Sequence, residues 1–337
     1  MRDVRIRYGL TALLATALLL PGLLIARLTP AAVAVTKRPP SHQRISAPAT
    51  TNIVKAPELV AHAPWFGLQV LSDPSPLHEV PPAQPAPAMG AAAGILIDVD
   101  TGGILWQQNP HASLPPASTT KIVTAMVALR NFDPQQLITI TPEALHQAWD
   151  ETKMGLVSGE KVSVEDLVTG ALLVSGNDAA DALAMDTVGM ENFVEAMNSQ
   201  VRALGLHDTH FVTPVGLDDP GQRASAHDLA VLARTAVQTY PLFRRIVATP
   251  AATIPATATH HQFDLYNLNE LVHTYPGAVG VKPGWTGSAG SCLVGMATRG
   301  GHQLLSVLLN APLPATQTKR LFDWGFTEEE SAAHRPR

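Results

Sequence analysis

A serine and a lysine stand three residues apart in the segment 116–121, Pro-Ala-Ser-Thr-Thr-Lys. At the start of a helix this spacing places both side chains on one face, about one turn apart. The helix N-terminus also supplies partial positive charge and free backbone N–H groups. A lysine that is desolvated there can lose its proton near neutral pH and act as a base. Ser118 and Lys121 are therefore a candidate nucleophile and base, although a serine helix cap followed by a surface lysine gives the same pattern.

Two further segments carry side chains that could serve the same reaction. The first is Ser175-Gly176-Asn177, between two apolar helical patterns, where a serine hydroxyl and an asparagine amide can relay a proton and hold a substrate carbonyl. The second is the segment 282–286, Lys-Pro-Gly-Trp-Thr, where a glycine after a strand lysine lets a substrate backbone approach closely. Taken singly, the first is equally an ordinary turn between helices, and the second a surface lysine before a turn.

The chain must bring these three segments together from distant positions. The predicted elements are, in chain order, a strand pair over 94–98 and 103–106, helices over 118–130, 164–173, 178–185, 191–204 and 226–237, strands over 279–282 and onward, 292–298 and 303–309, and a helix over 316–324. Strands from both chain ends around an inserted helical body predict an α/β (α+β) fold. In it, an antiparallel sheet combines N- and C-terminal strands with a helical subdomain.

The N-terminal part of the chain differs in composition from the rest. Three arginines among the first seven residues precede an apolar stretch from Tyr8 to Ala26, a pattern typical of an export signal or a retained membrane anchor. The segment that follows is rich in proline and alanine and predicts an extended linker. The predicted organisation is a signal or anchor over 1–35, a linker over 36–90, a catalytic domain over 91–326 and a short polar tail over 327–337. With so short a tail, we expect any membrane attachment to be N-terminal, and the catalytic part to lie outside the cytoplasm.

Charge and composition exclude several classes of function. The chain has 337 residues, with 46% hydrophobic and 15% charged, which is a globular composition. Its formal net charge is −5, and because the first 35 residues carry +3, the remainder carries −8. Without clustered Lys and Arg, this acidic body excludes nucleic acid as a partner. The single cysteine, Cys292, excludes an intramolecular disulfide and is predicted to be a small buried hydrophobic residue, and no motif implies a metal or a cofactor.

Together and in this order, the three segments are close to the signature of penicillin-binding proteins and class A β-lactamases. They resemble one family in particular, the low-molecular-mass D-alanyl-D-alanine carboxypeptidases of the penicillin-binding protein 5 type. The likeness extends over about residues 91–326, in strings such as Met154-Gly155-Leu156, 225–230 (Ser-Ala-His-Asp-Leu-Ala) and 323–326 (Asp-Trp-Gly-Phe). The resemblance implies a β-lactamase/transpeptidase-like fold and a serine D,D-carboxypeptidase that acts on peptidoglycan stem peptides.

The resemblance also implies a role for each matched residue. Ser118 would attack the carbonyl carbon of the penultimate D-alanine, Lys121 would take the serine proton, and Ser175 would relay a proton to the departing D-alanine. The implied substrate-binding residues are Asn177, Lys282, Gly284, Trp285 and Thr286. The backbone N–H groups of Ser118 and Trp285 would form the oxyanion hole. β-Lactam antibiotics would acylate Ser118 by the same chemistry.

One position departs from the family pattern, because Pro283 stands where the third motif normally has threonine. The missing hydroxyl usually helps to hold the terminal carboxylate of the substrate, and proline also removes a backbone donor. Thr286 still offers a hydroxyl, but period-two alternation puts it on the opposite strand face from Pro283 unless the strand bulges. We expect activity to survive with weakened carboxylate recognition. The alternative is a catalytically impaired protein that binds peptidoglycan stems.

A class A β-lactamase is a weaker alternative. Such an enzyme would have Asp at the middle position of the second motif, where this chain has Gly176. It would also carry a Glu-x-x-Leu-Asn loop, and the nearest similar string, 264–267, has the wrong spacing and position.

Overall fold

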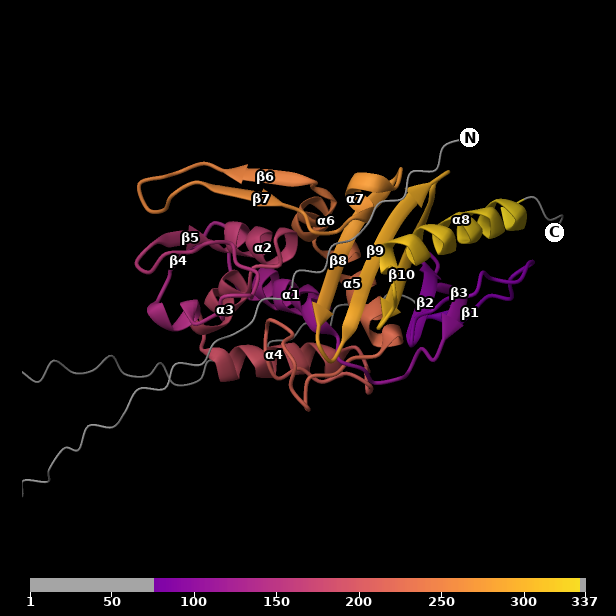
Figure 1. Cartoon of the computed structure of the whole chain (residues 1–337), viewed down its shortest axis with the longest axis horizontal. Coiled ribbons are helices and arrows are strands. Elements are labelled where there is room, and N and C mark those ends of the chain that lie inside the picture. Colours follow the sequence, from indigo (N-terminus) through magenta and orange to yellow (C-terminus); the bar gives the residue numbers. More distant parts are fainter. Residues whose placement is uncertain (1–75, 334–337) are drawn as a thin grey trace, which may run out of the picture. The chain divides into compact units, whose positions relative to one another are not determined.

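A mixed sheet of strands from both ends of the chain forms the centre of the protein, as seen in a computed structural model that describes residues 76–333. The sheet has six strands in the order β1-β3-β2-β10-β9-β8. Its strands are β1 (His78–Glu79), β2 (Ala93–Asp98), β3 (Gly103–Gln108), β8 (Ala278–Thr286), β9 (Gly290–Arg299) and β10 (His302–Leu309). β10 pairs with β2 in antiparallel fashion, so elements distant in sequence lie side by side (Figure 1). The predicted sheet of N- and C-terminal strands is thus confirmed.

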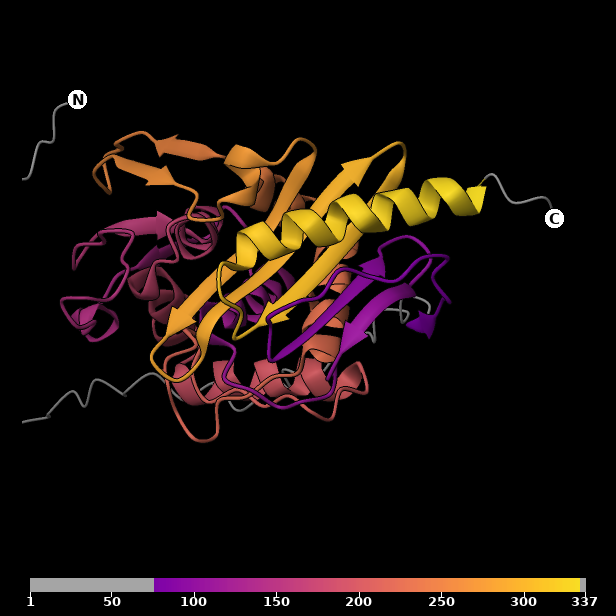
Figure 2. The same ribbon diagram turned by 45° about the vertical axis from the view of Figure 1, so that its right-hand side comes forward.

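Helices cover both faces of this sheet. They are α1 (Lys121–Asn131), α2 (Val164–Leu173), α3 (Asn177–Met185), α4 (Met190–Ala203), α5 (Ala226–Thr239), α6 (Pro241–Ala248), α7 (Leu271–Thr274) and α8 (Pro314–Ala333). The long helix α8 lies across one face (Figure 2). α5 packs against β2 and β10 and belongs to the helical body on the other face. The predicted helical subdomain is therefore present, and its helices come from the part of the sequence between β3 and β8.

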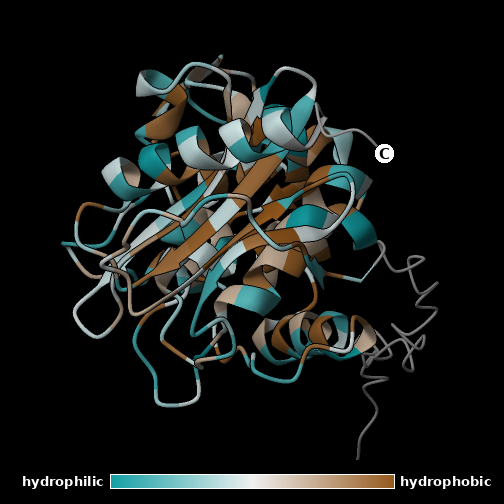
Figure 3. Ribbon diagram, turned by 90° about the vertical axis from the view of Figure 1, so that its right-hand side faces the viewer, coloured by the Kyte–Doolittle hydropathy of each residue, from teal (hydrophilic) through white to brown (hydrophobic). Residues whose placement is uncertain are grey.

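Both faces of the central strands are buried. Leu96 of β2 lies in the hydrophobic cluster that includes Phe322 of α8, whereas Ile95 and Ile97 lie in the larger cluster of the helical body. Successive side chains of a strand point to opposite faces, so a strand covered on both sides must be almost continuously apolar. Figure 3 shows this as hydrophobic strands in the middle of the molecule. The run Gly-Ile-Leu-Ile in β2 is explained by this double burial.

Two serines fix the starts of helices that flank the site. The side chain of Ser163 accepts a hydrogen bond from the backbone N–H of Asp166 at the start of α2. Ser225 accepts one from the backbone N–H of Asp228 at the start of α5. Each such cap stabilises a helix by about 0.5–2 kcal/mol.

Besides β1, α6 and α7, four short strands and two 3₁₀ turns were not predicted from the sequence. They are β4 (Leu137–Thr139), β5 (Lys161–Ser163), β6 (Ala251–Ile254), β7 (Phe263–Tyr266), η1 (Ala117–Thr120) and η2 (Pro142–Leu145). β4 pairs with β5 and β6 with β7, each as a separate two-stranded sheet. Between β4 and β5 the chain forms a long loop, residues 140–160, which contains η2 and reaches α3. Strands of three or four residues are too short for their alternation to stand out from neighbouring loops.

Two predicted segment boundaries need correction. The linker was predicted to extend to residue 90, but β1 pairs with β3. The polar tail was predicted to begin at residue 327, but α8 continues to Ala333. Glu328 is only 6% exposed and accepts hydrogen bonds from the backbone N–H groups of Ala83 and Gln84. These contacts, between parts of the chain more than 240 residues apart, have no local sequence pattern that could predict them.

The predicted export segment, 1–35, and most of the predicted linker lie outside the described residues. Within residues 76–333, no helix has the length and apolar character required to cross a bilayer.

Candidate active site

The predicted nucleophile and base are brought together at the start of α1. Ser118 lies in the 3₁₀ turn η1, and Lys121 is the first residue of α1, so the regular helix begins slightly later than predicted. Ala117 has a φ of 49°, and this left-handed residue turns the chain into η1. The Nζ atom of Lys121 lies 3.0 Å from the Oγ atom of Ser118. A proton can therefore pass directly between the two groups.

The other contacts of Lys121 orient its amine. Its side chain is fully buried, and Nζ donates to Asn177 Oδ1 at 2.6 Å and to the backbone oxygen of Val215 at 2.9 Å. A neutral amine has two N–H donors and one lone pair. Because the two carbonyl oxygens accept the two donors, the lone pair is left to face the hydroxyl of Ser118. This arrangement suits a general base.

A second lysine is buried beside the first. Burial lowers the pKa of Lys121 to about 7, although the negative charges of Asp181, Glu151 and Asp178 act to raise it. Lys282 is also fully buried, and burial together with the charge of Lys121 lowers its pKa well below its ordinary value. Burial of its amine therefore favours the neutral form of Lys121 near physiological pH.

The second motif forms the turn between α2 and α3. Ser175 has a φ of 60° and is only 5% exposed, while Asn177 begins α3. The backbone N–H of Asn177 donates to the oxygen of Thr152 at 2.8 Å, and the Thr152 hydroxyl donates to the oxygen of Ser175 at 2.7 Å. The loop between β4 and β5 therefore holds this turn in place.

Two carboxylates that the sequence analysis did not select also fix the turn. Glu151 Oε2 accepts a hydrogen bond from Asn177 Nδ2 at 2.6 Å. Asp178 is 2% exposed, and its carboxylate accepts from three consecutive backbone N–H groups, those of Met154, Gly155 and Leu156. For Asp178 a signal was present, because an acidic residue in the first turn of a short helix is positioned to accept backbone donors.

The third motif lies on β8, at the edge of the sheet. An ideal Cβ on Gly284 would lie 2.8 Å from the backbone nitrogen of Ser118, so only glycine lets this strand lie so close to η1. β8 is an edge strand, which is where proline is tolerated within a sheet, and this explains how Pro283 is accommodated. Trp285, which follows Gly284 on β8, is 70% exposed.

The hydroxyl of Thr286 is not free in this structure. It donates to Asp218 Oδ1 at 2.5 Å and accepts from the backbone N–H of Ala289 at 3.0 Å. Burial acts to raise the pKa of Asp218, but the hydrogen bonds from Thr286 and Ser288 hold that pKa below its usual value. The hydroxyl that Thr286 offers is therefore already bound to Asp218 in this conformation.

A cleft of about 610 Å³ joins the three motifs. All the predicted site residues except Lys121 line it, namely Ser118, Ser175, Asn177, Lys282, Gly284, Trp285 and Thr286. Lys121 lies behind Ser118 in the buried interior. Among the described residues that line the cleft, the charged ones are Lys282 and three carboxylates, Asp150, Glu151 and Asp218. The cleft is therefore acidic, and its lysine is buried.

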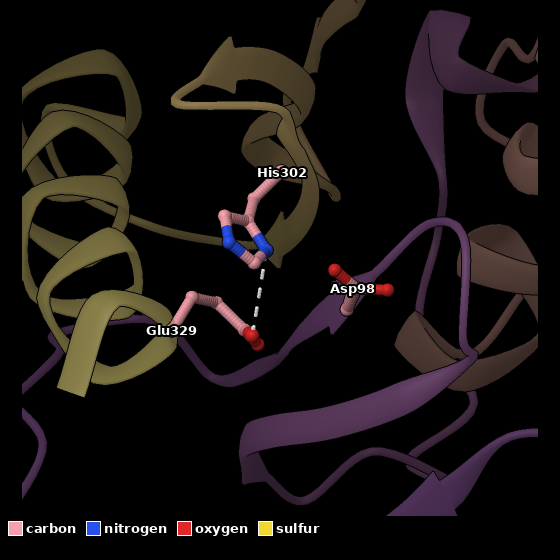
Figure 4. A group of neighbouring side chains, drawn as sticks. All are labelled: Asp98, His302 and Glu329. Atoms are coloured by element: carbon pink, nitrogen blue, oxygen red, sulfur yellow. Dashed lines mark ion pairs between the residues drawn. The ribbon is translucent and has the colours of Figure 1, made fainter. Parts of the chain in front are cut away.

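A second group of ionisable side chains lies elsewhere, and none of its members lines the cleft. It consists of Asp98, His302 and Glu329, from β2, β10 and α8 (Figure 4). His302 Nδ1 lies 3.6 Å from Glu329 Oε2, and Asp98 Oδ1 accepts from the backbone N–H and the hydroxyl of Thr101, both at 2.7 Å. These contacts tie α8 to β10 and close the turn between β2 and β3, so we assign the group a structural role.

Known proteins are similar to this chain in sequence and in fold. The profile of the family described as D-alanyl-D-alanine carboxypeptidase (Peptidase_S11) matches residues 80–313. D-alanyl-D-alanine carboxypeptidase DacB2 of Mycobacterium tuberculosis is 36% identical over 257 residues, which cover 74% of this chain and 87% of that protein. DacF of Bacillus subtilis is 32% identical over 250 residues, which cover 72% of this chain and 63% of DacF.

Solved structures are also similar to this chain in fold and sequence. The crystal structure of D-alanyl-D-alanine carboxypeptidase from Mycobacterium tuberculosis matches with a TM-score of 0.68 and 36% identity, covering 74% of this chain and 96% of that one. The Streptomyces K15 DD-transpeptidase matches with a TM-score of 0.68 and 31% identity, covering 72% of this chain and 100% of that one. The chain thus belongs to the D-alanyl-D-alanine carboxypeptidase family of serine peptidases and has the fold of penicillin-binding proteins.

Proposed function

We propose that this protein is an exported serine D,D-carboxypeptidase that removes the terminal D-alanine from peptidoglycan stem peptides through an acyl-enzyme at Ser118. The observation that carries the mechanism is the arrangement around Lys121. Its amine is buried, gives its two N–H donors to carbonyl oxygens, and lies 3.0 Å from Ser118 Oγ. Family membership supports the reaction, and this geometry supports the covalent route.

In the acylation step, Ser118 Oγ attacks the carbonyl carbon of the penultimate D-alanine, and its proton moves to Lys121 Nζ. The oxyanion accepts hydrogen bonds from the backbone N–H groups of Ser118 and Trp285, each worth roughly 3–4 kcal/mol in comparable sites. The amide C–N bond then breaks. The departing D-alanine nitrogen takes a proton from the hydroxyl of Ser175, which is resupplied from Lys121.

In the deacylation step, water attacks the ester carbonyl carbon. The neutral amine of Lys121 can take a proton from that water as it did from Ser118. The ester bond breaks, the proton returns to Ser118 Oγ, and the shortened stem leaves as a carboxylate. β-Lactams form the same ester on Ser118.

Asn177 and Lys282 have supporting roles in this mechanism. Asn177 Nδ2 lines the cleft and carries a second hydrogen beyond the one donated to Glu151, which can bind a substrate carbonyl. Lys282 lines the side of the cleft formed by β8, where its amine can donate hydrogen bonds to the substrate and, when protonated, supplies a positive electrostatic field. Gly284 supports the oxyanion hole, because its lack of a side chain lets β8 lie close to the backbone nitrogen of Ser118.

Recognition of the terminal carboxylate is expected to be weak. Pro283 lacks a hydroxyl, Thr286 gives its hydroxyl to Asp218, and the cleft is acidic. These features are also what a catalytically impaired stem-binding protein would show. We favour the enzyme because Lys121 Nζ lies within hydrogen-bonding distance of both Ser118 Oγ and Asn177 Oδ1, as the acylation step requires.

The proposed location is outside the cytoplasm, where peptidoglycan stems are exposed. It rests on the family's action on the cell wall and on the N-terminal segment 1–35, with its arginines followed by an apolar stretch. The same segment would provide any attachment to the membrane.

Release of D-alanine from a synthetic stem peptide ending in D-Ala-D-Ala tests the proposed function. We expect turnover by the parent protein, none with Ser118→Ala, and none on the matching peptide that ends in L-alanine. Slow hydrolysis of the benzylpenicilloyl ester on Ser118, with release of benzylpenicilloate, would distinguish the protein from a β-lactamase. Labelling without any D-alanine release would favour the stem-binding alternative.

A further inference from the structure

The side-chain amide of Asn177 lies between groups of opposite charge. Its Oδ1 atom is 2.6 Å from Lys121 Nζ, and its Nδ2 atom is 2.6 Å from Glu151 Oε2. The oxygen and nitrogen ends of a carboxamide have almost the same shape, so packing alone does not decide which end faces the lysine. A carboxylate only accepts hydrogen bonds, and it therefore holds the nitrogen end on its own side. The oxygen end is then left to accept from Lys121.

We infer that Glu151 is a positioning residue for the acyl transfer: it fixes the orientation of the Asn177 amide and, through it, the direction of the Lys121 lone pair toward Ser118. The inference rests on the proposed function. If the amide turned over, its NH₂ group would face Nζ, and the lysine lone pair would be drawn from the serine hydroxyl to this new donor. The base would then lose its alignment with the nucleophile.

Glu151 is itself held rigidly enough to act in this way. Its second oxygen, Oε1, accepts a hydrogen bond from the backbone N–H of Ala148 at 2.9 Å. The next residue, Thr152, is joined to the turn by two hydrogen bonds that do not involve the Glu151 carboxylate. Its backbone oxygen accepts from the N–H of Asn177, and its hydroxyl donates to the backbone oxygen of Ser175. A further bond, from Gln147 Nε2 to Asp181 Oδ2 at 2.8 Å, joins the loop to α3. The loop is thus attached at several points, so loss of the Glu151 carboxylate alone should leave it in place.

The charge of Glu151 has a second, separable effect on Lys121. The ionisable groups that act on this lysine are Asp181 and Asp178 on α3 and Glu151 on the loop, and the pKa of Lys282 on β8 is in turn lowered by the charge of Lys121. The three carboxylates favour the protonated lysine. Removal of one of them therefore makes proton loss easier and moves the acid limb of the activity profile to lower pH.

These two effects can be separated by three variants. Glu151→Ala removes both the hydrogen-bond acceptor and the charge. Glu151→Gln removes the charge but keeps one acceptor oxygen for Asn177 Nδ2. Asp150→Asn is the matched control, because Asp150 lines the same cleft next in sequence yet makes no hydrogen bond with any residue between 76 and 333.

The measurements are the second-order rate of acylation by a fluorescent penicillin and the rate of D-alanine release, each across pH. Glu151→Ala should slow acylation on the order of 10- to 100-fold, the size expected when a reacting group is misaligned. Glu151→Gln should recover part of that rate and show the same shift of the acid limb to lower pH. Asp150→Asn lowers the negative charge of the cleft without touching the Asn177 amide, so it should not reproduce the rate loss.

Parental rates and parental pH profiles in both Glu151 variants would overturn the inference. An equal loss of rate in Asp150→Asn would also overturn it, because the effect would then belong to the general charge of the cleft. Should thermal unfolding show that Glu151→Ala does not fold, the pH profile and rate of Glu151→Gln decide the question alone. Failure of the parent to be acylated at all would instead reject the proposed function, and the inference with it.

Discussion

The hydroxyl of Thr286 is bound to the carboxylate of Asp218, with 2.5 Å between Oγ1 and Oδ1. Asp218 follows Val215 on the same loop, and the backbone oxygen of Val215 accepts a hydrogen bond from Lys121. One loop therefore orients the base and also accepts the hydrogen bond of the Thr286 hydroxyl. A substrate carboxylate that approaches this end of β8 meets a negative charge and a hydroxyl that already has an acceptor. This relationship predicts a measurable penalty for anionic substrates.

Asp218→Asn should relieve that penalty. The variant removes the negative charge, and we expect kcat/KM for a D-Ala-D-Ala peptide to rise about three- to fivefold, since exposed charge interactions are worth up to ~1 kcal/mol. The measurement is D-alanine release at several substrate concentrations. Asp219→Asn is the control, because Asp219 binds the backbone N–H of Gly221 and does not line the cleft. A fall in kcat/KM with Asp218→Asn would show that this carboxylate assists substrate binding.

Pro283→Thr should improve recognition of the substrate carboxylate. A hydroxyl that donates to a charged group contributes about 1.5–3 kcal/mol, so an increase in kcat/KM on the order of 10- to 100-fold is expected. Pro283→Ala restores the backbone N–H without a hydroxyl and separates the two effects. Equal gains in both variants would assign the improvement to the backbone donor instead.

Acylation should depend on pH through Lys121. Below its pKa of about 7 the lysine is protonated and cannot accept the proton of Ser118, so the acylation rate should rise as pH increases through this region. Asp181→Asn removes a negative charge that favours the protonated lysine, so the rising limb should move to lower pH. Asp186→Asn, which alters a carboxylate bound to Thr141, should leave the limb where it is. A limb that moves to higher pH in Asp181→Asn would contradict this assignment of the base.

Gly284→Ala should disable acylation. The new Cβ would lie 2.8 Å from the backbone nitrogen of Ser118 and would push β8 away from the oxyanion hole. We expect a loss of about 100-fold or more in the rate of penicillin acylation. Gly287→Ala is the matched control, since its Cβ meets nothing nearer than Asp218 Oδ2 at 3.9 Å. A parental acylation rate in Gly284→Ala would show that the strand does not need this close approach.

Much of the fold was accessible from local patterns in the sequence. The spacing of Ser118 and Lys121 correctly placed both groups on one helix face, because i and i+3 residues are neighbours on a helix whatever the rest of the chain does. The burial predicted for Cys292 is confirmed, since it is 1% exposed and burial raises its pKa to about 11. The longer helices and the three C-terminal strands were predicted because their apolar periodicity extends over enough residues.

The parts that could not be predicted depend on contacts between distant positions. Glu151 is 26 residues from Asn177, and Asp218 is 68 residues from Thr286. In sequence, both acidic residues look like ordinary solvent-facing loop residues, because no periodicity or spacing links them to their partners. Their roles emerge only when the sheet, the helical body and the loop between β4 and β5 are assembled.

Intact mass spectrometry after exposure to benzylpenicillin tests the central claim most directly. The proposed mechanism predicts that the parent protein gains the mass of one intact penicillin, that Ser118→Ala gains none, and that the modified peptide contains residue 118. Absence of an adduct on the correctly folded parent, or an adduct that persists in Ser118→Ala, would contradict Ser118 as the nucleophile.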